Sequence, residues 1–398
     1  MTVLKKLSEL CTDIVDCPHS TPNWLSSGIV VLRNFNLVDG FIDTSEIYYV
    51  DEQTYKERTK RIVPKEGDII FSREAPVGNC AIVPPNFKCC LGQRLVLLRA
   101  NRDLCSPEYL LAMLNSQAVK SQIEQVEKTG STVSNFNIGD LKELLIPYVE
   151  DFNIQRKITS VYASLMTRID NNNKIDHDLT SLIEDTFKYW FLQHNFPNAQ
   201  NKPYALNGGE LIEDKRIKTK FPKTWKLGTI GELIKESDKS KIQVNQVALK
   251  PGDIPFFTSG DEVLRYNDYM VDGFNIFMST GGNSVIKAFN GKAHYSTDTW
   301  CINAGECSAY LYLFLKTINN RINDYFFAGS GLKHLQKEQL RSIFIEIPET
   351  EVVKKFNEIV MPMFLKKSKI MNENYELIRI RDYLLPLLIS GQLTVNDN

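Results

Sequence analysis

An apolar ladder in the middle of the chain constrains its fold more than any other feature. In alternating steps of four and three residues it comprises Ile154, Ile158, Val161, Leu165, Arg168, Asn172, Ile175, Leu179, Leu182, Thr186 and Tyr189. This spacing is typical of the seam of a long coiled-coil helix. A second ladder comprises Val352, Phe356, Ile359, Met363, Lys366, Ile370, Glu373, Leu377, Ile380, Leu384 and Leu387. A basic residue occupies the same step of both ladders, so the sequence predicts a duplicated chain with two equivalent helices.

The sequence before each ladder has the pattern of a mixed α/β domain. Short β-rich runs lie between turn residues, for example at 29–32 and 95–98, and Ser106 with Pro107 opens a helical pattern. The predicted fold class is therefore α+β, with two α/β domains that are each followed by a long helix. The predicted segments are a first domain at 1–149, a long helix at 150–194, a linker at 195–220, a second domain at 221–348 and a second long helix at 349–398.

The two long helices are expected to pair, because an apolar seam on a long helix is stabilised by burial. We favour an antiparallel coiled coil with internal pseudo-twofold symmetry; parallel pairing, with the linker reaching back, is the alternative. Arg168 and Lys366, the basic residues of the two ladders, are predicted to set the register of the seam. Pro362 predicts either a kink in the second helix or a later start.

Composition narrows the class of protein. The chain has 398 residues, a formal net charge of −1 and 43% apolar residues, which is typical of a soluble protein with real cores. No apolar run approaches the roughly 20 residues of a membrane span. The eight cysteines include no C-x-x-C pair. We expect reduced, buried thiols, a cytoplasmic location and no metal site.

A search for catalytic motifs predicts no active site. The chain lacks a G-x-x-x-x-G-K-[ST] loop, and its five histidines lie at neither metal-ligand nor triad spacing. Residues 84–87, PPNF, have the residue types of an amino-methyltransferase motif in the wrong order. Two alternatives stay open: a catalytic α/β enzyme with an unrecognised site, and a coiled-coil scaffold that binds proteins.

Several blocks resemble one family when they are taken in order. They are DCPHSTP at 16–22, GDIIFSREA at 67–75, CLGQR at 90–94, FKYWF at 187–191, FPKTWKLG at 221–228 and LLPLLISG at 384–391. Together with the duplicated frame, they resemble the specificity (S) subunit of Type I restriction-modification systems over essentially the whole chain. The second domain matches the family pattern less well than the first.

The resemblance implies a non-catalytic adaptor. Each target recognition domain would read one half of a bipartite target in double-stranded DNA. The helices would set the half-site spacing and dock two modification (methyltransferase) subunits, which use S-adenosylmethionine. Restriction subunits, ATP-dependent nucleases that use Mg, would join them. This chain itself would hold no cofactor.

Polar loop residues are the candidates for DNA contact, because Arg and Lys suit guanine edges and phosphates while Asn and Gln suit adenine. In the first domain they are His19, Ser20, Asn23, Arg33, Asn34, Asn36, Ser72, Arg73, Gln93, Arg94, Lys128, Thr129, Ser131 and Asn135. In the second domain they are Thr258, Ser259, Ser279, Thr280, Asn283, Lys287, Ser296, Thr297, Ser330, Lys333 and His334. A structural role is the alternative for each; Arg73 and Arg94 in particular could pair with Glu74 or Asp68.

Partner docking is expected on the helix faces beside the seam. The candidate residues are Tyr162, Met166, Ile169, Phe187 and Trp190. The alternative for these side chains is a buried contact between domain and helix.

Overall fold

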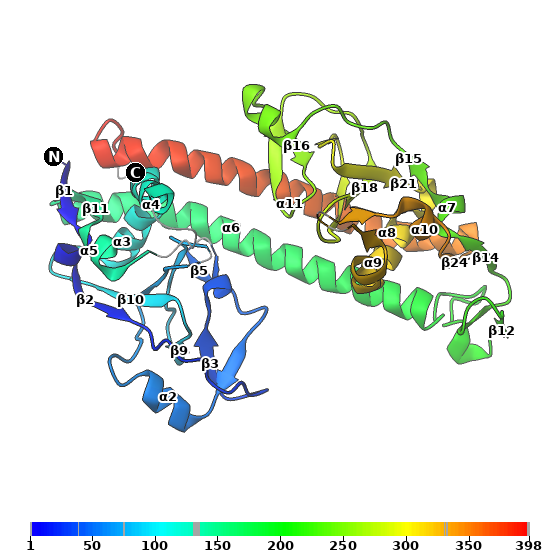
Figure 1. Cartoon of the computed structure of the whole chain (residues 1–398), viewed down its shortest axis with the longest axis horizontal. Helices are drawn as coiled ribbons and strands as arrows, with labels where there is room; N and C mark the ends of the chain where they lie inside the picture. Colours follow the sequence, from blue (N-terminus) through cyan, green and yellow to red (C-terminus); the bar gives the residue numbers. More distant parts are fainter. Residues whose placement is uncertain are drawn as a thin grey trace. The chain divides into compact units, whose positions relative to one another are not determined.

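A computed structural model describes residues 2–38, 40–74, 76–129, 136–329, 331 and 333–395, with the backbone alone for 127–129. The chain divides into two compact units. The first contains Met1–Asn172 and Asn374–Asn398, and the second contains Asn173–Glu373. Two long helices, α6 (Phe152–Phe187) and α11 (Thr350–Ser390), contribute to both units. Each unit is therefore one mixed domain together with one part of each long helix (Figure 1).

The described residues of the first unit form four sheets, of which the smallest pairs β4 (Leu37–Val38) with β5 (Phe41–Ile42). The main sheet is antiparallel, in the order β2 (Cys11–Asp16), β10 (Leu95–Ala100), β7 (Ile69–Ser72) and β8 (Cys80–Ile82). The second sheet has the order β6 (Tyr48–Val50), β3 (Ile29–Leu32) and β9 (Cys89–Leu91), and the third pairs β1 (Thr2–Lys6) with β11 (Leu145–Val149). The remaining helices are α1 (Leu7–Leu10), α2 (Glu52–Arg58), α3 (Pro107–Leu114), α4 (Gln117–Thr129) and α5 (Ile138–Glu143).

Strand β10 has a buried side chain on both faces. Because successive side chains of a strand point in opposite directions, Val96 and Leu98 join one core with α3, whereas Leu95 and Leu97 join another against β3 and β9. Because β10 is buried on both faces, its residues 95–98 are all apolar instead of alternating between apolar and polar. Helix α3 begins as the sequence predicts, because the Ser106 side chain accepts a hydrogen bond from the backbone N–H of Tyr109.

The second unit repeats this arrangement. Its main sheet has the order β15 (Lys235–Glu236), β21 (Thr299–Asn303), β18 (Phe274–Ser279) and β19 (Ile286–Asn290). The smaller sheets are β17 (Val263–Tyr266), β16 (Ile254–Phe257) and β20 (His294–Tyr295), the pair β14 (Lys226–Thr229) and β24 (Phe344–Ile347), the pair β12 (Leu211–Glu213) and β13 (Lys220–Pro222), and the pair β22 (Phe327–Ala328) and β23 (His334–Leu335). The helices are α7 (Ile230–Leu233), α8 (Ser308–Thr317), α9 (Asn319–Tyr325) and α10 (Lys337–Arg341). The matching strand orders confirm the predicted duplication.

The long helices run antiparallel within each unit. In the first unit, the Asn172 side-chain amide donates to Oδ1 of Asn374 at 2.9 Å, and Nη1 of Arg381 lies 3.8 Å from the Met166 sulfur. In the second unit, Lys367 Nζ donates to Asp176 Oδ2 at 2.7 Å, and the ring centroids of Trp190 and Phe356 lie 5.8 Å apart. As residue numbers rise along α6, the numbers of their α11 partners fall.

The buried stripe of α6 is shifted from the predicted ladder by about one residue. Ile158 and Asn172 of the ladder are buried, but between them burial selects Tyr162, Met166 and Ile169 in place of Val161, Leu165 and Arg168; the five buried residues are each at most 5% exposed. Apolar residues occupy two neighbouring stripes here, and the stripe with the bulkier side chains enters the core.

The shift corrects two sets of predicted residues. Arg168 and Lys366, proposed for the seam register, are exposed. Conversely, the docking candidates lie in the hydrophobic cores, where a partner on the surface does not reach them: Tyr162, Met166, Ile169, Phe187 and Trp190. The alternative for these five, a buried contact between domain and helix, is the arrangement in the structure.

Helix α11 accommodates Pro362 in its interior. The helix is continuous from Thr350 to Ser390, so the predicted later start is wrong. Pro362 and Glu358, whose carbonyl loses its usual i+4 donor, are both exposed. Water can therefore satisfy that carbonyl. No helix in the described part of the chain is long and apolar enough to cross a membrane.

We predict that Asn172→Ala lowers the free energy of unfolding of the first unit by about 1–2 kcal/mol, because it removes a buried hydrogen bond between the helices. Urea unfolding followed by circular dichroism measures the change. The matched control is Asn171→Ala, at an exposed neighbouring position, which should change stability by no more than about 0.5 kcal/mol. Equal effects of the two substitutions would contradict a role for the Asn172–Asn374 pair.

Candidate nucleic-acid interface

Two parallel strands of the first domain end side by side and bring candidate residues together. Strands β3 and β9 pair in parallel, with Leu32 opposite Leu91. The chain leaves β3 through Arg33 and Asn34, and leaves β9 through the turn at 92–94. Because parallel strands end at the same edge of a sheet, residues far apart in the sequence become neighbours there.

Gly92 permits the close approach of these two strand ends. Its backbone N–H donates to the Leu32 carbonyl at 2.7 Å. A Cβ at position 92 would lie 2.7 Å from that same oxygen, a distance to which real Cβ atoms essentially never approach another atom. A glycine at this position therefore places Gln93 and Arg94 beside Arg33 and Asn34.

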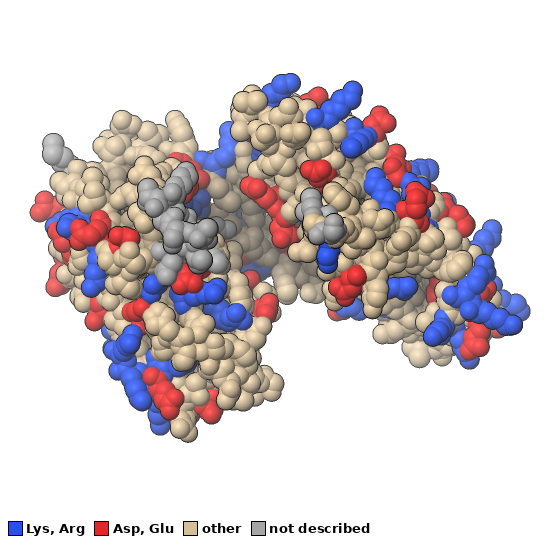
Figure 2. Space-filling view, viewed as in Figure 1, with Lys and Arg blue, Asp and Glu red and all other residues tan. Residues whose placement is uncertain are grey.

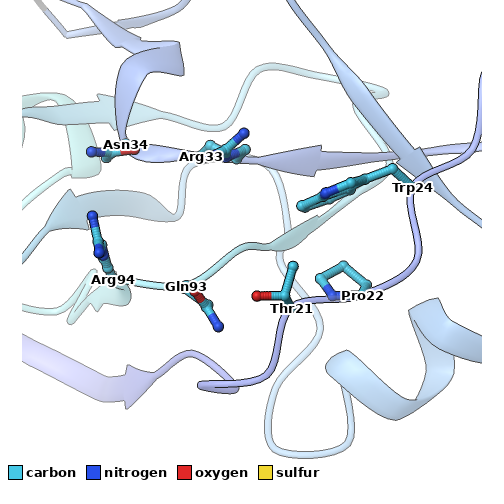
Figure 3. Close-up of a pocket in the computed structure, with 7 residues that line it drawn as sticks. All are labelled: Thr21, Pro22, Trp24, Arg33, Asn34, Gln93 and Arg94. Atoms are coloured by element: carbon cyan, nitrogen blue, oxygen red, sulfur yellow. The ribbon is translucent and has the colours of Figure 1, made fainter.

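These residues surround a pocket of about 190 Å³. Figure 3 shows Arg33 and Asn34 across the space from Gln93 and Arg94, with the β2–β3 loop closing a further side. The lining residues are Thr21, Pro22, Trp24, Arg33, Asn34, Gln93 and Arg94. The pocket thus combines guanidinium and amide donors with an indole ring, which are the groups that bind nucleobases and phosphates.

Arg33 lies against three aromatic rings. Its guanidinium carbon is 4.9 Å from the ring centroids of Phe35 and Tyr48, and 5.6 Å from that of Trp24. Trp24 and Tyr48 also contact one another, with centroids 4.9 Å apart. Cation–π attraction of this kind orients a guanidinium without using its N–H donors.

Arg94 is held differently. Its backbone φ is +70°, in the left-handed region that non-glycine residues rarely adopt. Its Nε lies 3.0 Å from Glu74 Oε2, so the predicted alternative, an ion pair with Glu74, is present. Strained backbone of this kind persists where the surrounding structure holds it and is common at functional sites.

Three other candidates of the first domain are buried and serve the fold. Asn36 donates to the carbonyls of Asp43 and Glu46. Ser72 donates to the Glu74 carbonyl, and Arg73 pairs with Asp16 at 2.8 Å. Since these donors are already satisfied inside the domain, we correct their assignment from DNA contact to structural support.

The remaining candidates of the first domain lie on its surface or outside the described residues. His19, Ser20 and Asn23 are exposed on the β2–β3 loop. The Gln93 side-chain amide donates to the His19 carbonyl, which ties this loop to the turn at 92–94. The structure does not describe the side chains of Lys128 and Thr129, and Ser131 and Asn135 lie outside the described residues.

Arg58, which the sequence patterns did not indicate, links the β2–β3 loop to the end of β9. This 7% exposed arginine donates from Nε and Nη2 to the Leu91 carbonyl at 2.9 and 2.8 Å. It also donates to the carbonyls of Ser20 and Pro18 at 2.9 and 3.2 Å. Among the described residues no carboxylate pairs with it. Arg58 therefore fixes both the β2–β3 loop and the end of β9, and nothing in its local sequence signals that role.

The second domain has the same edge with different side chains. Strands β16 and β20 pair in parallel, and the Ser296 N–H donates to the Phe257 carbonyl at 2.9 Å, as Gly92 does to Leu32. Thr258 and Ser259 follow β16, whereas Ser296 and Thr297 follow β20. The two domains share this strand pairing, but the loops of the second domain carry hydroxyl side chains at the positions where the first domain has arginine and amide side chains.

The hydroxyls of Thr258 and Ser296 are engaged inside the second domain. Thr258 donates to the Glu262 carbonyl at 2.7 Å, and Ser296 shares a hydrogen bond of 2.8 Å with the Thr299 hydroxyl. Both residues are buried, so they shape the loops, while Ser259 and Thr297 are half-buried. Ser279 is also buried and donates to the Asn283 carbonyl at 2.6 Å.

A second group of candidate DNA-contacting residues lies close together at the β18–β19 turn. The Leu335 N–H donates to the Thr280 carbonyl at 3.0 Å, and the Gly282 N–H donates to the Lys333 carbonyl at 2.9 Å. These bonds place Thr280 and the exposed Asn283 beside the exposed Lys333 and His334. Ser330 lies outside the described residues.

The candidate Lys287 has a pKa below that of a solvated lysine. Its ammonium donates to the carbonyls of Gly260 and Glu262. Burial lowers the pKa of Lys287 to about 8, and the carboxylates of Asp261 and Glu262 partly oppose that effect. The side chain is thus mostly charged near neutral pH and loses its charge above the folded pKa.

An exposed basic cluster lies around the β12–β13 pair. Its members are Lys215, Arg216, Lys218, Lys220, Lys223 and Lys226. Arg216, Lys220 and Lys223 have carboxylate partners within 4 Å. Figure 2 shows the resulting mixture of blue and red beside β12. The partial neutralisation favours a solvated connector here over a dedicated phosphate-binding arm.

No cluster of three or more His, Cys, Asp or Glu side chains able to hold a metal ion occurs among the described residues. The cysteines are buried or half-buried and unbonded to one another. Burial raises the pKa of the Cys80 and Cys105 thiols to about 12, so both are protonated near neutral pH.

Comparison with known proteins accounts for the repeated arrangement of a domain followed by a long helix. The family model for the Type I restriction modification DNA specificity domain matches the chain twice, at residues 24–184 and 222–379. The chain belongs to this family. The first match covers the first domain from residue 24 and α6 as far as residue 184, and the second covers the second domain and α11 as far as residue 379.

Curated relatives cover most of this specificity-domain chain. It is 27% identical over 376 residues to the Type I restriction enzyme MjaIX specificity subunit of Methanocaldococcus jannaschii, covering 87% of this chain and 82% of the relative. It is 21% identical over 405 residues to the HindI specificity subunit of Haemophilus influenzae, covering 83% and 87%. The crystal structure of the S subunit from M. genitalium has a similar fold, with a TM-score of 0.56 and 18% identity over 98% of this chain and 96% of that one.

We predict that Arg58→Ala lowers the free energy of unfolding of the first unit by about 2–3 kcal/mol, because it leaves three carbonyls without their charged donor. Chemical denaturation measures this change. Lys60→Ala removes an exposed positive charge close by in the sequence and should leave stability within about 0.5 kcal/mol of the parent chain. If Arg58→Ala were equally neutral, Arg58 would not hold the two loops.

Proposed function

We propose that this chain is the DNA-reading subunit of a Type I restriction-modification complex, in which each domain reads one half of a bipartite target in double-stranded DNA. The observation that carries the proposal is the duplicated strand edge. Parallel pairs β3–β9 and β16–β20 present loops from the same place in two equivalent domains. The side chains on those loops differ, as two readers of different half-sites require.

The proposed division of labour follows the predicted segments. Residues 1–149 and 221–348 are the two target recognition domains, 150–194 and 349–398 are the paired helices, and 195–220 is the linker. We propose that the helices form an antiparallel coiled coil with pseudo-twofold symmetry and set the separation of the half-sites. The antiparallel contacts within each unit support this arrangement.

Exposed apolar residues of the long helices are better docking candidates than the buried ones. Ile175 and Leu182 lie seven residues apart on α6 and are 39% and 51% exposed. Because seven residues make almost two helical turns, these side chains form one stripe. We propose that such stripes receive two modification subunits, which would supply the S-adenosylmethionine-dependent methylation. ATP-dependent restriction subunits would join the same cytoplasmic complex.

The decisive experiment is methylome sequencing of cells that express the modification subunit with and without this chain. We expect a split adenine-methylated motif that is present only when both proteins are produced, because a specificity subunit supplies sequence selection but no chemistry. An unchanged methylome would overturn the proposed function. The modification subunit expressed alone is the control.

A second prediction concerns the spacer between half-sites. Seven helical residues inserted after Asn172 in α6, with seven more before the facing Asn374 in α11, should lengthen the spacer by up to about three base pairs. The reason is that seven residues add about 10 Å of helix and DNA rises about 3.4 Å per base pair. Methylome sequencing reads the new motif. Each half-site should stay unchanged; an altered half-site with the original spacer would contradict the role of the helices.

A further inference from the structure

Arg33 differs from the neighbouring arginines in how its guanidinium is used. Arg73, Arg94 and Arg99 pair with carboxylates at 2.8, 3.0 and 2.7 Å. Among the described residues, by contrast, no carboxylate pairs with Arg33, and its side-chain contacts are with aromatic rings. The N–H edge of this guanidinium is therefore available to a ligand, although the side chain itself is already oriented.

The surroundings of Arg33 indicate which kind of ligand fits. Asn34 and Gln93 also line this pocket, with their amides donating to the carbonyls of Glu74 and His19, while Trp24 and Phe35 expose 37% and 36% of their surface. Exposed ring surface suits the apolar parts of a base pair better than it suits a strongly hydrated phosphate. A planar fork of N–H donors matches two acceptors side by side, as O6 and N7 of guanine provide in the major groove.

We propose that Arg33 reads a guanine in the half-site of the first domain, with Trp24, Phe35 and Tyr48 acting as positioning residues that hold its guanidinium. This inference rests on the proposed function and deepens it by naming a base and the residue that selects it. Pre-orientation by the rings reduces the side-chain entropy lost when the arginine binds.

The second domain provides a natural contrast. The position equivalent to Arg33, directly after β16, is Thr258, whose hydroxyl is buried and donates to the Glu262 carbonyl at 2.7 Å. Among the described residues of the second domain, this position of the edge thus carries a hydroxyl in place of a guanidinium fork. A change at Arg33 should therefore affect one half-site only.

The test is methylome sequencing of cells that produce the modification subunit with the parent chain or with Arg33→Gln or Arg33→Lys. With either variant, one G·C position of one half-site should become degenerate, with guanine preference falling by roughly 5- to 150-fold, because a bidentate contact contributes about 1–3 kcal/mol of discrimination. Arg33→Lys keeps the charge but loses the fork, so it should relax the same position. The other half-site should not change.

Control variants distinguish the loss of base reading from the loss of a positive charge and from misfolding. Lys56→Gln removes an exposed positive charge from the same domain and should leave the motif intact. Trp24→Leu, which removes one ring of the cradle, should relax the same base position by a smaller factor. Thermal melting of each purified full-length variant checks that the fold is retained.

Two outcomes would overturn the role of Arg33. One is an unchanged motif with Arg33→Gln. The other is a uniform decrease in methylation with the motif intact, which would identify a phosphate contact instead. Both differ from failure of the proposed function, in which the parent chain itself produces no split motif.

Discussion

The packing of the long helices into the domains is the constraint on which the rest of the structure depends. In the first unit, one core contains Ile158, Tyr162 and Ile169 of α6, Leu385 and Leu388 of α11, and the apolar residues of α3 and β10. In the second unit, Phe187, Trp190 and Phe356 enter the core of the other domain. A domain and its helix segments thus share one hydrophobic core, and burial of that apolar surface stabilises both together.

Recognition geometry follows from the strand pairing that these cores support. Parallel pairing brings two loop origins to one edge in each domain, and a backbone hydrogen bond joins them, from Gly92 to Leu32 and from Ser296 to Phe257. Because this bond joins backbone atoms, the strand pairing can stay the same while the side chains of the loops differ between the two domains. Arg58 adds a second constraint in the first domain, because its donors fix two loops that would otherwise adopt many conformations.

Periodicity and motif order predicted much of the fold. They predicted the duplication, the mixed domains, the start of α3 at Ser106 and the family, because each depends on local patterns that recur along the chain. They did not predict which side chains are accessible. Asn36, Ser72 and Arg73 looked like recognition residues, yet they are buried donors, because the folded chain covers them; the carboxylate partner of Arg73, for example, is Asp16, 57 residues away. Only the three-dimensional arrangement determines such covering.

The long helices show the same division between local and tertiary information. The sequence by itself determined that two equivalent amphipathic helices exist, since a repeat of three and four residues is a property of the chain alone. The tertiary structure decided which apolar positions of α6 are buried between Ile158 and Asn172, where each buried residue follows the predicted one by one position, about 100° around the helix. It also decided that Arg33 keeps an available N–H edge whereas Arg73 and Arg94 pair with carboxylates. Those outcomes depend on packing and on charges from distant segments, which no local pattern encodes.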